Sequence, residues 1–89
     1  MRDKLLAQKF GSTVRHLRLQ AGFSQEEFAE HCQLHRTYIG LIERGERAIT
    51  IETASKLVKV LGISLSQLFE QVETIPDIPS TETSNLGGE

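Results

Sequence analysis

The side chains with the greatest capacity for chemistry gather between His31 and Arg47. His31, Cys32 and His35 are residue types that bind zinc. His31 and Cys32 are adjacent, so on a helix they would project about 100° apart, and no fourth ligand is evident nearby. We therefore expect no metal site and interpret Cys32 as a small buried apolar residue.

The sequence holds no recognisable catalytic set. It has no Gly-rich phosphate loop, no nucleophile with a nearby base and no paired metal-ligand motif. Cys32 is the only cysteine, which excludes an intrachain disulfide and a zinc site built from several cysteines. We expect neither an enzyme nor a protein with a cofactor.

Three arginines in this segment, Arg36, Arg44 and Arg47, raise the question of a basic face. The 89-residue chain has 10 basic and 12 acidic residues, a formal net charge of −2. All the basic residues lie within residues 2–59, and the last three acidic residues lie beyond residue 73, so residues 1–73 are slightly positive. The overall charge therefore argues neither for nor against a nucleic-acid partner. That question depends on whether basic side chains gather on one face.

The length and composition are those of one small soluble domain. No apolar run approaches the ~20 residues that span a bilayer, and residues 1–9 lack the features of a signal peptide. We expect a cytoplasmic protein with no membrane partner.

From residue 74 onward the composition shifts to Pro, Ser, Thr, Gly and acidic residues. We predict a folded domain over residues 1–73 and a disordered acidic tail over 74–89.

Apolar residues spaced by three and four predict an all-α domain of five short helices. The expected inner face of the first helix comprises Leu6, Phe10, Val14, Leu17 and Ala21. The corresponding residues of the second helix are Phe28, Ala29 and Cys32, and those of the third are Ile39 and Ile42. The fourth helix would use Ile51, Ala54, Leu57, Val58 and Leu61, and the fifth Leu65, Leu68, Phe69 and Val72.

Capping residues set the expected helix ends. Ser24 with Glu27, and Ser64 with Gln67, make two capping boxes, and Thr50 caps the fourth helix. Gly22, Gly45 and Gly62 end the first, third and fourth helices.

The second and third helices are separated by a turn of about three residues, Gln33 to His35, which is the spacing of a helix-turn-helix. Ala29 is small where the two helices would cross. Ile39 and Ile42 would fasten the third helix, about Arg36 to Arg44, to the core. Its other face would then be free to enter a DNA major groove.

With this geometry the sequence resembles the Cro/C1-type (Xre) helix-turn-helix family, over nearly all of residues 8–72. The resemblance implies a lambda-repressor-like DNA-binding fold. The small size and the string Arg36-Thr37-Tyr38-Ile39 are most similar to the controller proteins of restriction-modification systems. The matching residues are Val14-Arg15-x-Leu17-Arg18, Ser24-Gln25-Glu26-Glu27-Phe28-Ala29, Arg36-Thr37-Tyr38-Ile39, Ile42-Glu43-Arg44-Gly45, and Thr50 with Lys56-Leu57, Leu61-Gly62-Ile63-Ser64 and Leu68-Phe69.

The resemblance implies two kinds of DNA contact. Arg36 and Thr37 would read base edges, by a bidentate grip on guanine and a methyl contact with thymine. A side chain at Gly40 could obstruct the approach of DNA. The residues expected to hold the DNA backbone are Gln25, Tyr38, Arg44, Arg47 and Thr50.

Two residues depart from the family pattern in the turn. The family commonly has Gly where this chain has Gln33, and a left-handed conformation would cost Gln roughly 1 kcal/mol. We therefore expect the turn to take another geometry. His35 replaces the short polar cap common in the controller group.

The resemblance also makes Arg18 and Glu43 a structural ion pair between the first and third helices.

The fifth helix carries more apolar surface than a terminal helix of this size needs. Leu65, Leu68, Phe69 and Val72 are either core residues alone or core residues that also form a dimer seam. The seam is favoured because one helix in one groove gives few contacts, whereas two subunits on adjacent half-sites give usable affinity.

We expect a homodimeric transcriptional regulator on a palindromic operator in double-stranded DNA. The resemblance implies a restriction-modification controller protein, and we expect a contact with RNA polymerase as well. The alternative is a protein-interaction module on the same fold, such as an antitoxin, with the tail from Thr74 to Glu89 binding a basic partner.

Overall fold

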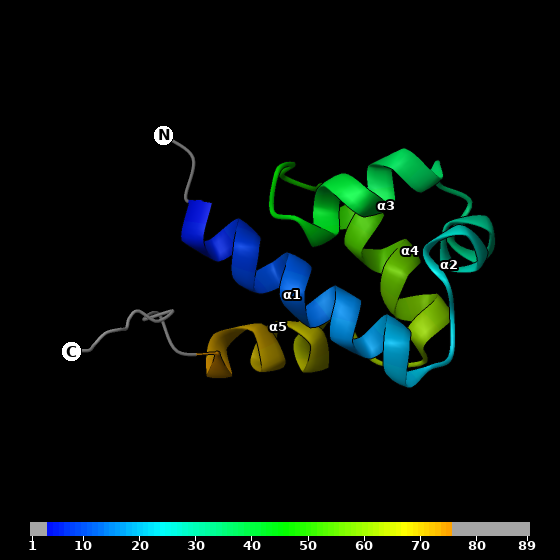
Figure 1. The fold of residues 1–89 in the computed structure, drawn as a ribbon. Coiled ribbons are helices and arrows are strands. Elements are labelled where there is room, and N and C mark those ends of the chain that lie inside the picture. The colour runs from blue at the N-terminus through cyan, green and yellow to red at the C-terminus, as the bar shows by residue number, and fades with distance from the viewer. Residues whose placement is uncertain (1–3, 76–89) are drawn as a thin grey trace.

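Five helices account for most of residues 4–75, the part of the chain that the structure, a computed structural model, describes (Figure 1). No strand occurs in this part, so the all-α prediction is confirmed. Most of the predicted tail, residues 76–89 of 74–89, lies outside the described residues; of its first two residues, Thr74 ends the last helix and Ile75 is the C-cap. The helices are α1 (Lys4–Gln20), α2 (Gln25–Cys32), α3 (Arg36–Glu43), α4 (Ile51–Leu61) and α5 (Leu65–Thr74).

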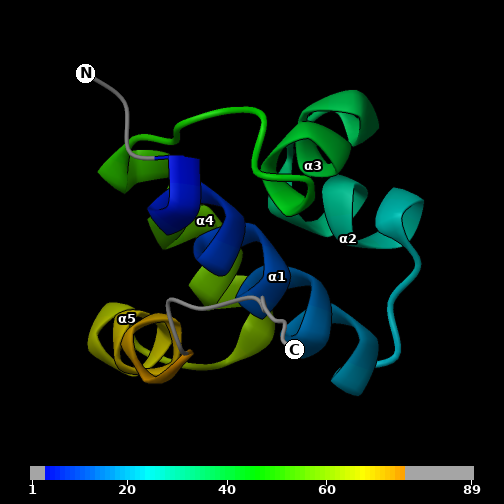
Figure 2. The ribbon, with the colours of Figure 1, turned by 60° about the vertical axis from the view of Figure 1, so that its left-hand side comes forward.

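Helix α1 runs through the middle of the arrangement. It packs against α3 on one side and α5 on the other, while α2 packs on both α3 and α4 (Figures 1 and 2). None of the helices in the described residues is long and apolar enough to span a membrane.

The predicted caps are present. Ser24 and Glu27 form a reciprocal capping box at α2: the Ser24 hydroxyl accepts from the Glu27 backbone N–H at 3.0 Å, and the Glu27 carboxylate accepts from the Ser24 backbone N–H at 2.9 Å. Hydrogen bonding of the Glu27 carboxyl to Ser24, first of all to its backbone N–H, lowers the pKa of that carboxyl. Ser64 with Gln67 repeats the arrangement at α5, and the Thr50 hydroxyl caps α4.

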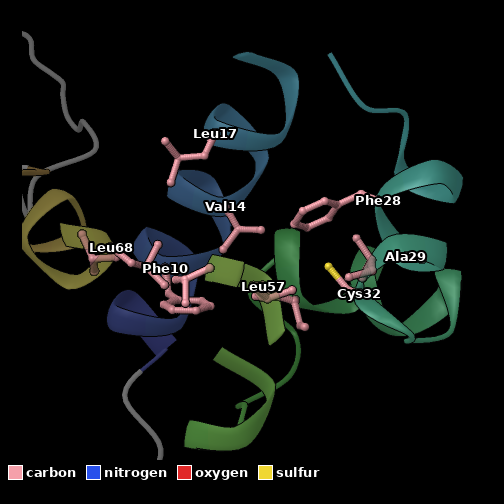
Figure 3. Packing of buried hydrophobic residues seen from close by; sticks show 12 residues of the cluster. Phe10, Val14, Leu17, Phe28, Ala29, Cys32, Leu57 and Leu68 are labelled. Carbon is pink, nitrogen blue, oxygen red and sulfur yellow. The ribbon is translucent and has the colours of Figure 1, made fainter. Parts of the chain in front are cut away.

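The core lies where all five helices face one another, and Figure 3 shows its residues from α1, α2, α4 and α5. Val14, Phe28 and Leu57 are fully buried, as the helical spacing predicts. Cys32 is buried among them, and burial raises the pKa of its thiol to about 11. Within the described residues no group of His, Cys, Asp or Glu side chains could hold a metal ion.

Four residues predicted to face inward are exposed instead: Leu6, Ala21, Ile51 and Phe69. Leu6 is 52% exposed and Ile51 is 77% exposed. Both lie in the first turn of their helices, α1 and α4, where the apolar pattern continues beyond the edge of the core. Ala21 follows the last residue of α1. Phe69, on α5, is 43% exposed.

The four residues of the predicted dimer seam on α5 differ in how deeply the structure buries them. Leu68 and Val72 are completely buried within the protomer, so assigning them to the seam is corrected: they are core residues. Leu65 is partly buried against the core, and Phe69 is the most accessible of the four. The sequence could not separate these two groups, because Leu65 with Phe69 and Leu68 with Val72 have the same i, i+4 spacing, and the packing of α1 and α4 on α5 distinguishes them.

Helices α1 and α3 cross at very short range. Gly11 is buried at the crossing, where a Cβ atom would overlap the carbonyl oxygen of Ile42 and lie 2.7 Å from that of Glu43. Gly45, with φ of 73°, ends α3 against α1, and a Cβ there would lie 2.7 Å from Cγ of Gln8. Gly11 on α1 and Gly45 at the end of α3 therefore both need to be glycine. The close contact that they allow between the two helices fixes the direction of α3.

Candidate nucleic-acid interface

The turn between α2 and α3 is left-handed at Gln33, with φ of 61° and ψ of 42°. The expectation of another geometry is therefore wrong. The Gln33 N–H bonds the Glu30 carbonyl at 3.1 Å, and the Leu34 N–H bonds the Ala29 carbonyl at 2.9 Å. This pair of bonds is the Schellman pattern, and Leu34 packs on the core beside it. These contacts offset the cost of roughly 1 kcal/mol for a left-handed Gln.

His35 caps α3 although its side chain is not the short polar one the family favours. Its Nδ1 accepts from the backbone N–H of Thr37 at 3.1 Å. Helix α3 thus begins at Arg36, as predicted, and its last helical residue is Glu43, with Arg44 as the C-cap. The inner face carries Ile39 and Ile42, which are fully buried.

The predicted ion pair between Arg18 and Glu43 is present and bidentate. Nε of Arg18 lies 2.7 Å from Oε2 of Glu43, and Nη2 lies 3.0 Å from Oε1. The remaining Nη1 donates to the carbonyl of Phe23 at 2.8 Å. The pair therefore ties α1 to α3 and to the loop that precedes α2.

Gln25, predicted to bind the DNA backbone, also takes part in this network. Its Nε2 donates to Oε1 of Glu43 at 3.0 Å. A primary amide has two N–H groups, so one remains for a phosphate oxygen. The resemblance implied that Gln25 contacts the DNA backbone and did not indicate a bond to a buried carboxylate.

Gly40 lies between two predicted backbone contacts. A Cβ built on Gly40 would be 3.1 Å from Nη1 of Arg44 and 3.9 Å from Oε1 of Gln25. The guanidinium of Arg44 also pairs with the exposed carboxylate of Glu46 at 3.1 Å. The structure thus brings Gln25 and Arg44 together over a backbone that carries no side chain.

Tyr38 and Arg47 form a second group. The guanidinium carbon of Arg47 lies 5.4 Å from the centroid of the Tyr38 ring, within the range of a cation–π contact. The Thr50 hydroxyl accepts from the Thr53 N–H at 3.1 Å, so its side chain serves the cap of α4. Arg36 and Thr37 are exposed at the start of α3.

An apolar groove of about 490 Å³ adjoins this face, and the sequence did not indicate it. Three exposed apolar residues, Leu6, Ile51 and Phe69, line it, and they come from three separate helices. The apolar pattern had assigned these three residues to inner helix faces, so it did not mark them as exposed. The remaining lining residues are Ala7, Phe10, Arg47, Ala48, Ile49, Thr50, Ala54, Val72 and Glu73.

Comparison with known proteins bears on this geometry. A family model described as a helix-turn-helix matches residues 14–68. The control protein C.BamHI of Bacillus amyloliquefaciens is 44% identical over 62 residues, which are 68% of this chain and 76% of the relative. The HTH-type transcriptional regulator PuuR of Escherichia coli is 39% identical over 79 residues, which are 89% of this chain and 41% of the relative.

Two solved structures are also similar. The restriction-modification controller protein C.AhdI of Aeromonas hydrophila has a TM-score of 0.69 at 40% identity, covering 71% of this chain and 96% of its own. The controller protein C.Esp1396I, solved as a tetramer on its natural 35-base-pair operator, has a TM-score of 0.71 at 35% identity, covering 78% and 91%. The protein therefore belongs to the Cro/C1-type helix-turn-helix family of DNA-binding transcriptional regulators.

Proposed function

We propose that this protein binds a two-fold symmetric operator as a homodimer, with one α3 in the major groove of each half-site, and so regulates transcription. The observation that carries the proposal is the contrast between the buried inner face of α3 and its exposed first residues. Its inner face is fixed by Ile39, Ile42 and the ion-paired Glu43, while Arg36 and Thr37 are exposed at its start. A rigid helix with an exposed arginine at its N-terminal end has the form of a recognition helix.

In this proposal Arg36 and Thr37 read bases. The two side-chain groups described above hold the sugar-phosphate backbone on either side of them. Gln25 with Arg44 forms one, and Tyr38 with Arg47 forms the other. Thr50 would contribute the backbone N–H groups at the start of α4, where the helix dipole favours a phosphate.

The dimer would form through the groove and Phe69. Exposed Phe69 and Ile51 are apolar groups on the same face as an apolar hollow. A face that carries both can pair with a copy of itself about a two-fold axis. Leu65, at the edge of α5, would extend this contact.

The relatives favour a finer assignment: a controller protein that acts in the cytoplasm on restriction-modification genes. A dimer bound beside a promoter would adjoin RNA polymerase, and we include that contact in the proposal. Transcription from the bound promoter, measured with and without the protein, tests it. The alternative of a protein-interaction module depends on residues 74–89, nearly all outside the described residues, and no contact in the described part favours it.

The operator test uses a panel of duplexes, each with one base pair changed from the tightest-binding sequence. Replacing Arg36 with Ala should cost ~1–3 kcal/mol and abolish discrimination at one or two positions only. Replacing Arg47 with Ala should weaken binding to every duplex alike. It should also reduce the slope of log affinity against log salt concentration by about one. Lys59→Ala is the matched control, because it removes an exposed cation near the far end of α4. A uniform loss for Arg36→Ala contradicts base reading by that residue.

A further inference from the structure

The Glu43 carboxylate accepts three hydrogen bonds from two side chains. Arg18 supplies two of them, at 2.7 and 3.0 Å, and Gln25 supplies the third, at 3.0 Å. The Glu43 side chain is only 2% exposed. It therefore sits behind the proposed DNA face and reaches that face only through the Gln25 amide.

The chemistry of this contact fixes which way the Gln25 amide points. An ionised carboxylate can only accept, so Gln25 must present its nitrogen to Glu43. Its oxygen then turns toward Gly40, where it lies 3.9 Å from the position of a Cβ atom. Without Glu43, nothing in the described residues would distinguish the two amide orientations by hydrogen bonding.

Arg18 makes this arrangement compatible with DNA. An unpaired carboxylate behind the interface would repel phosphates. The bidentate guanidinium neutralises that charge while leaving the second lone pair of Oε1 to accept from the Gln25 amide. The pair is therefore suited to hold a phosphate-binding side chain, besides joining α1 to α3.

We propose that Glu43 is a positioning residue for DNA binding: it holds the Gln25 amide so that the second N–H faces the sugar-phosphate backbone beside Arg44. The inference rests on the proposed function, because it needs Gln25 to contact DNA. Fixing one flexible side chain in advance should strengthen binding roughly 3- to 10-fold, since that ordering no longer opposes association.

A double-mutant cycle tests the proposal. Four proteins are compared: the natural chain, Gln25→Ala, Glu43→Gln and the double variant. Affinity is measured by fluorescence anisotropy with the tightest-binding duplex selected from a random library, well below the melting temperature of the least stable variant. Urea unfolding of the same four proteins reports the structural role of Glu43 separately. Where Glu43→Gln does not fold cooperatively, Glu43→Asp takes its place, because it keeps the charge that Arg18 needs.

The expected result is that Glu43→Gln weakens DNA binding roughly 3- to 10-fold in the natural background and has no effect on binding once Gln25 is Ala. Its loss of stability should persist in both backgrounds. An equal loss of affinity in both backgrounds overturns the proposal, since Glu43 would then act only through the fold. If Gln25→Ala alone leaves affinity unchanged, the positioning role is also overturned. Base-specific loss with Arg36→Ala would then show that operator reading survives without it.

Discussion

Replacing Gly40 with Ala should make the protein more stable and a weaker DNA binder. Gly40 is a mid-helix residue of α3 with ordinary helical backbone, so Ala fits there and improves helix propensity by about 1 kcal/mol. The new Cβ would lie 3.1 Å from Nη1 of Arg44, the far end of a flexible and exposed side chain. Moving Arg44 disturbs only an exposed ion pair, which contributes little. We expect the melting temperature to rise by about 4 °C.

The same methyl group should obstruct the DNA backbone. It would stand between Gln25 and Arg44, where the proposed phosphate contact is made. A charge-assisted hydrogen bond contributes about 1.5–3 kcal/mol, so its loss should weaken operator binding by roughly 10- to 100-fold.

Thermal unfolding, monitored by circular dichroism, gives the melting temperature. Fluorescence anisotropy titrations at fixed salt give the operator affinity. Gln33→Gly is the matched control, because it relieves the left-handed strain in the same helix-turn-helix without adding an atom to the DNA face. It should stabilise the protein by under about 1 kcal/mol and leave affinity unchanged. Unchanged affinity for Gly40→Ala would refute the placement of DNA over Gly40, and a lower melting temperature would refute the packing argument.

Three further changes test the fold and the proposed dimer. Gly11→Ala should destabilise the protein by about 3 kcal/mol in urea unfolding, because its Cβ meets α3 backbone that cannot yield. Phe69→Asp should convert a dimer to monomers in sedimentation experiments, whereas Leu19→Asp, at an exposed apolar residue outside the groove, should not. The Cys32 thiol, whose pKa burial raises to about 11 from 9.0, favours the folded state below pH 9 and loses that contribution as pH rises toward 11. The urea midpoint should therefore fall over that range relative to Cys32→Ala, and equal pH profiles would contradict it.

The helices were predictable because their signals are local. Ser24 and Ser64 each form a capping box with a residue three positions later, and Thr50 caps α4 with its own side chain. Such patterns act within one helical turn, so they do not depend on where the other helices lie. The buried apolar faces follow from the same short-range spacing.

What the sequence could not predict depends on contacts between distant segments. Gly11 reads as a mild helix breaker, and only the crossing with α3 shows why it is needed. Ile51 continues an apolar pattern but lies beyond the edge of the core. Gln33 takes a left-handed conformation that local propensity opposes, because the packing of Leu34 favours it. In the candidate site, the partners of Gln25 and Arg44 likewise became evident only from the structure.

The loop between α3 and α4 connects the proposed DNA face to the proposed dimer face. Gly45 holds its start against Gln8 of α1, and Thr50 ends it as the cap of α4. Between them Arg47 stacks on Tyr38 on the DNA side and also lines the apolar groove. Because the loop is anchored at both ends, the two faces are held at a fixed angle within each protomer. A dimer formed through the groove would therefore present its two recognition helices at one separation, which is the condition for selecting an operator by the spacing of its half-sites.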